Sequence, residues 1–307
     1  MKTVDEIIKI LDSAGRVNVH VHTHLCDGAA DMTAENIASE AKKHRIGAVV
    51  LVPHFHRKLS DKNTKEELYT DTDEEIFLRL RDEIEAYARH GEVRFLLSTE
   101  TDILSTAGDL SLTLSPEAER ALDLITPTMN FNPLLPLRMV ALTNPKTRDG
   151  LHRSGEFEKA AAAAGGLSSV IEAIYRCEEQ AILHSPYPCM LGHFFSAHSL
   201  NTDYSWFDMR PEHLPLMEAG ARKVIDACGR MHAPIDITGL VAEGMTARQK
   251  MKKDGFLYDF QRSFIDRCRA AGVPVYPGSD AHRLARIGLI EYYYQAFYGL
   301  LNKTARE

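Results

Sequence analysis

The chain has 307 residues and a formal net charge of −7 at pH 7. Hydrophobic residues make up 44% of it and charged residues 26%, a composition that is typical of a globular protein. Because basic residues form no strong stripe in the sequence, this composition argues against a nucleic-acid-binding protein.

The apolar segments and the cysteines indicate where the protein works. No apolar segment is long enough to span a bilayer, and the N-terminus lacks the apolar core of a signal peptide. The five cysteines are scattered and form no C-x-x-C pair, a pattern that favours reduced thiols. We therefore expect a cytoplasmic protein that does not bind membranes.

Helix and strand patterns alternate along the chain. Apolar residues at helical spacing predict a first helix, and alternating valines predict the strand that follows it. The predicted helices cover 3–12, 33–43, 73–90, 115–123, 168–179, 211–231 and 257–271, and the predicted strands cover 17–22, 46–54, 93–100, 124–131, 181–186, 233–239 and 273–282. Such alternation predicts a parallel sheet with crossover helices, and about seven strands indicate a closed or nearly closed barrel.

The whole chain is predicted to form one α/β domain over residues 1–307. Residues 1–16 would form an N-terminal helix and 289–307 a C-terminal helix packed on the barrel. A short surface helix is expected at 159–166, ending at two glycines. The segments expected to lie in loops and to carry substrate specificity are 57–75, 143–155 and 187–210.

Histidine and acidic residues come at the ends of the predicted strands. In chain order they are His20, His22, His54, Glu100, His184, Asp280 and His282. Because the carboxyl ends of barrel strands converge on one face, we expect these side chains to line one pocket. A mixture of imidazole and carboxylate groups suits zinc, manganese or iron.

Spacing within the strands distinguishes ligands from other histidines. Residues i and i+2 of a strand point to the same side, so His20 and His22 can serve one site together. His24 lies past the strand end and is not counted as a ligand. His193 lies in a predicted loop and is kept as a possible ligand. A single strand histidine is usually a hydrogen-bonded core residue, but a whole set of them at strand ends indicates a metal site.

These residues stand in motifs that resemble those of the PHP (polymerase and histidinol phosphatase) family. The first motif is "HVHTHLCDG", which runs from His20 to Gly28 and carries Cys26 where the family usually has serine. The others are "VPH" ending at His54, "LLSTE" ending at Glu100, "LHSP" containing His184, and "GSDAH" at 278–282. The resemblance covers residues 17 to about 288 in the family's order.

The resemblance implies a distorted (β/α)7 barrel with a trinuclear metal site. One ion would be held by His20, His22, Glu100 and Asp280, and a second by Asp27, His54 and His282. Glu100 would bridge to a third ion with His184. The family usually adds another histidine to this third site, where the present chain has Asn130, a weak ligand. His152 or His193 could replace it, so two or three divalent ions are expected.

The resemblance favours a metal-dependent phosphoesterase that acts on a small phosphomonoester such as histidinol phosphate. A metal-activated hydroxide would attack phosphorus. Arg283 and Arg57 are candidates to hold the phosphate, and His56 or Asp27 to protonate the leaving group. The alternatives are a hydrolase of C–N or ester bonds, a protein-tyrosine phosphatase, and a non-catalytic metal-binding regulatory domain. The oligomeric state stays open.

Overall fold

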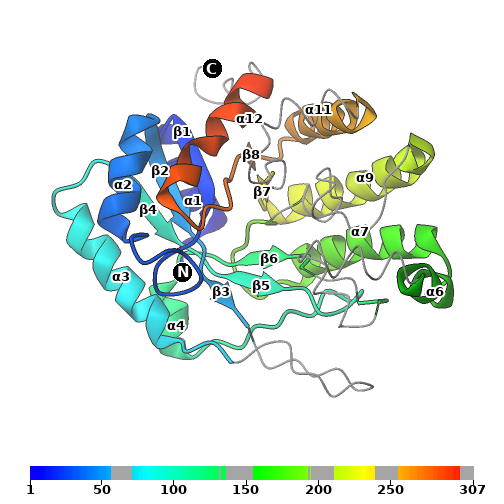
Figure 1. Ribbon diagram of the computed structural model, residues 1–307, viewed down its shortest axis with the longest axis horizontal. Helices are drawn as coiled ribbons and strands as arrows, with labels where there is room; N and C mark the ends of the chain where they lie inside the picture. Colours follow the sequence, from blue (N-terminus) through cyan, green and yellow to red (C-terminus); the bar gives the residue numbers. More distant parts are fainter. Residues whose placement is uncertain are drawn as a thin grey trace.

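The computed structural model describes residues 1–56, 71–130, 133–135, 155–192, 194, 211–238 and 255–297. In this part of the chain, helices and parallel strands alternate to form a mixed α/β fold (Figure 1). The strands lie between α2 and α3 on one side and α7, α9 and α11 on the other (Figure 1). Arg57, His152 and His193 lie outside the described residues.

The elements follow the predicted alternation. The first half contains α1 (Val4–Ser13), β1 (Arg16–Val21), α2 (Ala34–Lys43), β2 (Ile46–Leu51), β3 (His54–Phe55), α3 (Glu75–Ala88), β4 (Arg94–Leu97), β5 (Glu100–Asp102), α4 (Pro116–Ala121) and β6 (Thr126–Thr128). The second half contains α6 (Glu156–Ala163), α7 (Leu167–His184), η2 (Pro211–His213), α9 (Leu214–Met231), β7 (Ile235–Asp236), α11 (Gly255–Ala270), β8 (Val275–Tyr276), η3 (Leu284–Leu289) and α12 (Ile290–Ala296). Thr3, Thr33 and Ser115 each cap a helix by accepting a backbone N–H, which fixes where α1, α2 and α4 begin.

The strands pair in parallel throughout the described sheets. The pairings give the orders β1-β2-β4, β3-β5-β6 and β7-β8. Single bridges connect these sheets: Val21 to Ala281, Ile125 to Cys189, and Leu191 to Ile235. Within the described residues, the regular pairings therefore form three short sheets and not one continuous closed barrel.

The prediction of a strand at 181–186 is wrong, because α7 continues through His184. Its buried residues keep helical spacing to the end, as Ile174, Cys177 and Ala181 illustrate. The strand position is taken instead by residues 189–191, which bridge to the segments before β6 and in β7. His184 is exposed and lies before this strand segment. The other residues predicted at strand ends lie at or beyond the carboxyl ends of their strands.

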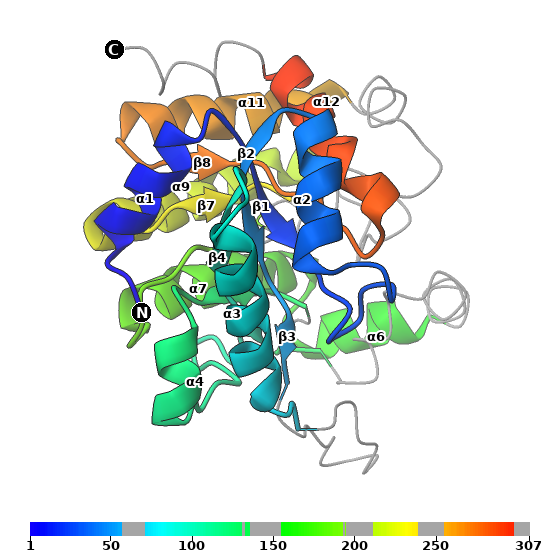
Figure 2. The same ribbon diagram turned by 90° about the vertical axis from the view of Figure 1, so that its left-hand side faces the viewer.

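Two sets of helices cover the strands with separate apolar cores. One core joins α2, α3 and α4 to the first sheet, and a larger one joins α7, α9 and α11 to the later strands. Figure 2 shows α9 lying between α7 and α11. Helix α12 packs on this body: Tyr293 is buried in the larger core, and the hydroxyl of Tyr294 accepts a hydrogen bond from the backbone N–H of Val17. No described helix is both long and apolar enough to cross a membrane.

Candidate metal centre

The ends of β1, β2, β4 and β8 bring most of the predicted ligands to one place. His20 is in β1, with His22 just after it, and their ring centroids are 5.2 Å apart, as expected for residues on one face of a strand. His54 begins β3 and lies directly opposite Glu100 at the start of β5. The segment after β8 reaches the same place through the hydrogen bond from the His22 N–H to the carbonyl of Ala281.

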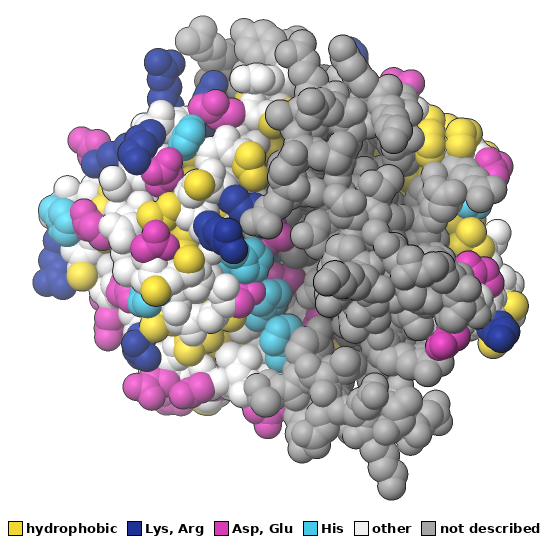
Figure 3. Space-filling view, viewed as in Figure 1, with side chains coloured by type: hydrophobic (Ala, Val, Ile, Leu, Met, Phe, Trp, Pro, Cys, Tyr) yellow, Lys and Arg dark blue, Asp and Glu magenta, His cyan; other side chains and the backbone are white. Residues whose placement is uncertain are grey.

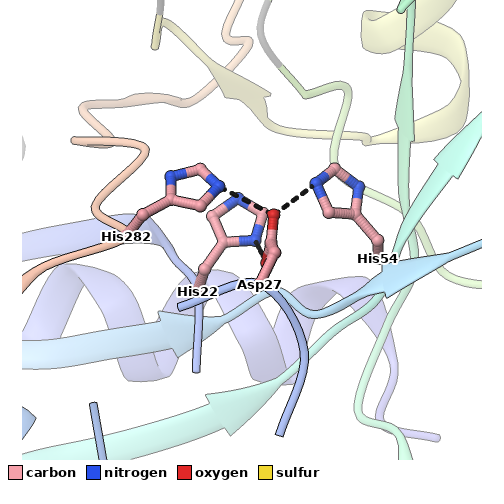
Figure 4. Close-up of side chains that lie close together, drawn as sticks. All are labelled: His22, Asp27, His54 and His282. Atoms are coloured by element: carbon pink, nitrogen blue, oxygen red, sulfur yellow. Dashed lines mark hydrogen bonds and ion pairs between the residues drawn. The ribbon is translucent and has the colours of Figure 1, made fainter. Parts of the chain in front are cut away.

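Asp27 lies at the middle of the first group of side chains, which we call the Asp27 group (His22, Asp27, His54 and His282; Figure 4). Its Oδ2 is 3.1 Å from His54 Nε2 and 2.8 Å from His282 Nε2. Its Oδ1 is 3.0 Å from His22 Nδ1. One ligand atom from each of these residues lies within 4.8 Å of all the others, so one cation could contact them together.

A second group adjoins the first and uses the other nitrogen of His22. In this Glu100 group (His20, His22 and Glu100), Glu100 Oε2 is 3.2 Å from His20 Nε2 and 3.6 Å from His22 Nε2. Asp280 lies beside it, with its Oδ1 3.0 Å from His22 Nε2. His22 therefore belongs to both groups, facing Asp27 through Nδ1 and Asp280 through Nε2.

The imidazole of His22 gives a direct test of whether a cation fits here. Both of its ring nitrogens are buried and lie 3.0 Å from a carboxylate oxygen, of Asp27 and of Asp280, but among the described residues neither makes a well-aligned hydrogen bond. Nδ1 of His54 is also buried without one, 3.4 Å from Glu100 Oε2. Buried polar atoms are costly unless they find partners. Imidazole nitrogens and carboxylates held in this way are the donor set of zinc, manganese or iron sites, so the residues fit a metal.

Asp236 holds His20 from behind. His20 Nδ1 is 2.9 Å from Asp236 Oδ2, which turns Nε2 of the same ring toward Glu100. The backbone N–H and the hydroxyl of Thr238 both donate to Asp236 Oδ1. A carboxylate behind a ligating histidine fixes its tautomer and orientation. The strand-end prediction did not include Asp236, although it follows the same rule, at the end of β7.

The close packing around position 278 explains why the "GSDAH" segment begins with glycine. A Cβ at this position would clash with the hydroxyl of Thr238 and would lie 2.6 Å from His20 Cβ and 2.7 Å from Asp236 Oδ1. The chain passes so close to this network that only glycine leaves it in place. Asp280 of the same segment has a φ of 49°, in the left-handed region, where aspartate and asparagine are tolerated better than most residues.

A third set of polar side chains lies beside Glu100. Asn130 Nδ2 is 2.9 Å from Glu100 Oε1 and 2.9 Å from Asp102 Oδ1. Asp102 Oδ2 is 3.2 Å from His56 Nδ1, and the His56 ring stacks on His54 at a centroid distance of 4.8 Å. Asp102 was also missed from the sequence, although it lies two residues after Glu100 on β5 and so on the same side of the strand.

The carboxylates and imidazoles shift one another's proton affinities. Burial lowers the pKa of His54, but the charges of Glu100 and Asp27 outweigh it and raise that pKa to about 9. Burial likewise opposes protonation of His20, yet Asp236 and Glu100 raise its pKa well above the ordinary value. Burial raises the pKa of Asp27, while His22, His282 and His54 together lower it far below the ordinary value. Metal binding here must therefore displace protons from imidazoles.

The remaining predicted residues lie in different surroundings. His24 contacts Glu83 and the carbonyl of Met32 and belongs to neither group of described residues. Arg283 is exposed and directly follows His282. His184 is the exposed last residue of α7 and is not brought into either group of described residues, so its role as a ligand stays a prediction.

The centre reaches the surface on the face seen in Figure 1. Figure 3 shows a row of histidine side chains there, with acidic side chains beside it and basic ones next to one end. Among the residues of the centre, the side chains of His54 and His56 are 20% exposed and that of His282 is 32% exposed. His20, His22 and Glu100 are buried beneath them. A small molecule could therefore approach the buried groups from this side.

Two solved structures that share this fold are described as histidinol phosphatases. The crystal structure of histidinol phosphate phosphatase (HISK) from Lactococcus lactis subsp. lactis Il1403, complexed with Zn, L-histidinol and phosphate, aligns over 95% of both chains with a TM-score of 0.54 and 10% sequence identity. The putative histidinol phosphatase of Listeria monocytogenes aligns over 89% of this chain and 97% of its own, with a TM-score of 0.54 and 15% identity. No protein-family model and no curated protein sequence matched. The resemblance predicted from the motifs is thus confirmed for the architecture: the chain has the fold of the histidinol phosphate phosphatases.

Proposed function

We propose that the protein is a metal-dependent phosphoesterase that hydrolyses a small phosphomonoester. The observation that carries this proposal is the pair of adjoining ligand groups that share His22. The phosphatase neighbours support it through their fold alone, because they are at most 15% identical to this chain. Histidinol phosphate is therefore the first substrate to try, within a wider set of monoesters.

The ligand sets follow the two groups. His20, His22, Glu100 and Asp280 would hold one divalent ion, and Asp27, His54 and His282 would hold the other. Such ions, when bound, lower the pKa of a coordinated water and neutralise charge on the phosphoryl oxygens. We also propose that the short parallel sheets correspond to a distorted seven-stranded barrel, with the centre at the carboxyl ends of its strands.

The other residues would position the substrate. Arg283 is exposed directly after His282, where its guanidinium could pair with phosphate oxygens. Asp27 is poorly suited to donate a proton, because the three surrounding imidazoles hold its pKa far below the ordinary value. His56 is the better candidate to contact the leaving group, because Asp102 holds its Nδ1 and the ring lies at the exposed edge of the centre.

The test is phosphate release with and without added zinc or manganese, comparing the wild type with Asp280→Asn. Asparagine keeps the left-handed backbone of this position but removes the charge. The loss of activity should exceed the roughly 10–100-fold that removal of an outer partner of a metal ligand costs. Asp31→Asn, which changes an exposed carboxylate away from the centre, should be as active as the wild type. Unchanged turnover in Asp280→Asn, or no phosphate release from any monoester, would contradict the proposal.

A further inference from the structure

The two carboxylate oxygens of Glu100 have different neighbours. Oε2 faces imidazoles, with His20 Nε2 at 3.2 Å and His54 Nδ1 at 3.4 Å. Oε1 instead accepts hydrogen bonds from the Thr128 hydroxyl at 3.1 Å and from Asn130 Nδ2 at 2.9 Å. Among the described residues, Oε2 therefore faces imidazoles that would bind a cation, while Oε1 faces neutral donors.

The amide of Asn130 connects two buried carboxylates. Glu100 and Asp102 are 0% and 1% exposed and lie two residues apart on β5, so they point to the same side. The Asn130 NH2 group lies 2.9 Å from an oxygen of each. Two neighbouring buried carboxylates repel each other unless a cation or hydrogen-bond donors lie between them. Here an amide, which offers two N–H donors, provides that link.

The register of the sheet fixes this link in place. Asp102 pairs directly with Thr128, and Asn130 follows two residues later on the same side. The other carboxylate oxygen of Asp102, Oδ2, lies within hydrogen-bonding distance of His56 Nδ1, at 3.2 Å. Glu100, Asn130, Asp102 and His56 thus form one hydrogen-bonded chain along the edge of the centre, which we call the Asn130 network.

We propose that Asn130 limits the centre to two metal ions. A third ion bound at Glu100 Oε1 would have to displace both the Thr128 hydroxyl and the Asn130 amide. The displaced amide could then offer the ion only its carbonyl oxygen, a weak ligand. The residue type at position 130 thus decides the number of ions. This inference rests on the metal centre of the proposed function, but it concerns the number of ions and not the reaction.

Metal content per chain tests the inference without using activity. Purified protein would be equilibrated with excess zinc, dialysed against a low zinc concentration, and analysed by inductively coupled plasma mass spectrometry. We expect two ions in the wild type. Asn130→Asp has nearly the same shape but replaces the donor with a carboxylate, and we expect it to bind a third ion. Asn36→Asp, a matched change at an exposed position of α2, should keep two.

The outcomes separate this inference from the proposed function. Three ions in the wild type would overturn the inference even if phosphate were released. Two ions without phosphate release from any monoester would support the inference and contradict the proposed function. If Asn130→Asp unfolds, which circular dichroism would reveal, Asn130→His takes its place, because imidazole also offers a lone pair. A folded variant at position 130 that still held two ions would overturn the role given to Asn130.

Discussion

Buried polar groups are treated differently in two regions of the molecule. At the strand ends, the buried nitrogens of His22 make no well-aligned hydrogen bond to the described residues, but carboxylate oxygens lie about 3 Å away on both sides. In the helix layer of α7, α9 and α11, the carboxyl group of Glu178 and the amide of Gln261 are also buried without a hydrogen bond in the described part of the chain. Burial is the one cause that shifts the pKa of Glu178, and it raises that pKa well above the ordinary value.

The difference shows two ways in which a fold accommodates a buried ionisable group. Where opposite charges surround the group, a cation can complete the set, and the residues are arranged for function. Where burial acts on the group and no opposite charge balances it, as for Glu178, the group takes up a proton and stays neutral. An orphaned buried atom thus indicates a metal site only when ligands of the right kind lie around it.

The largest effect that would sharpen this comparison is expected for Asp236→Asn. The amide cannot accept from His20 and from both donors of Thr238 at once, so His20 loses its fixed orientation. Zinc affinity, measured by competition with a chelator, should fall roughly 10–100-fold. Asp12→Asn is the control, because that carboxylate accepts a hydrogen bond from Tyr276 and not from a histidine. Wild-type affinity in Asp236→Asn would show that His20 needs no outer partner.

An intermediate effect, on stability, is expected for Glu178→Met. Because the pKa of Glu178 is raised in the folded state, the unfolded chain ionises first as pH rises above the ordinary value of 4.5, and folding is weakened from there upward. Removing the carboxyl group should raise the free energy of unfolding by about 1–3 kcal/mol at pH 8 and by less at pH 5.

Urea unfolding at the two pH values measures this effect. Glu172→Met is the matched control, since Glu172 lies on the same helix but is exposed, and its stability should change little at either pH. A gain for Glu178→Met that did not grow with pH would mean that its carboxyl group is not held neutral by burial.

The smallest effect is expected for His184→Ala. This histidine ends α7 on the surface, so its removal should leave the number of bound ions and their affinity unchanged. The number of bound ions, measured in the variant and in the wild type by metal analysis, checks this prediction. Loss of an ion in this variant would show that His184 is a ligand. The metal centre would then include the helix layer as well as the strand ends.

The sequence predicts the strand-end residues well, because a simple geometric rule governs them. His20, His22, His54 and Glu100 end or follow apolar strands, and parallel strands bring their carboxyl ends together. The same rule applied to "APIDITG" and "STETD" would have found Asp236 and Asp102. Neither of these two segments contains a histidine, so the histidine pattern of the sequence does not point to them.

The sequence fails where local pattern and tertiary structure disagree. The apolar run before His184 suits a strand as well as a helix, and only the packing of α7 against α9 decides for the helix. The sequence also does not reveal that one carboxylate oxygen of Glu100 faces imidazoles while the other accepts a hydrogen bond from an amide. It depends on the register of β5 against β6, which places Asn130 beside one oxygen only.

The shared position of His22 has a consequence for how the proposed centre fills. A neutral imidazole has one lone pair, so a nitrogen that binds an ion leaves its partner nitrogen protonated and able to donate. In the proposed ligand sets this lone pair would go to the ion held with Glu100, so the other nitrogen of His22 would donate to Asp27, a ligand of the second ion. Binding of the first ion fixes which nitrogen of His22 carries the proton before the second ion binds. The two sites therefore fill as a linked system and not independently.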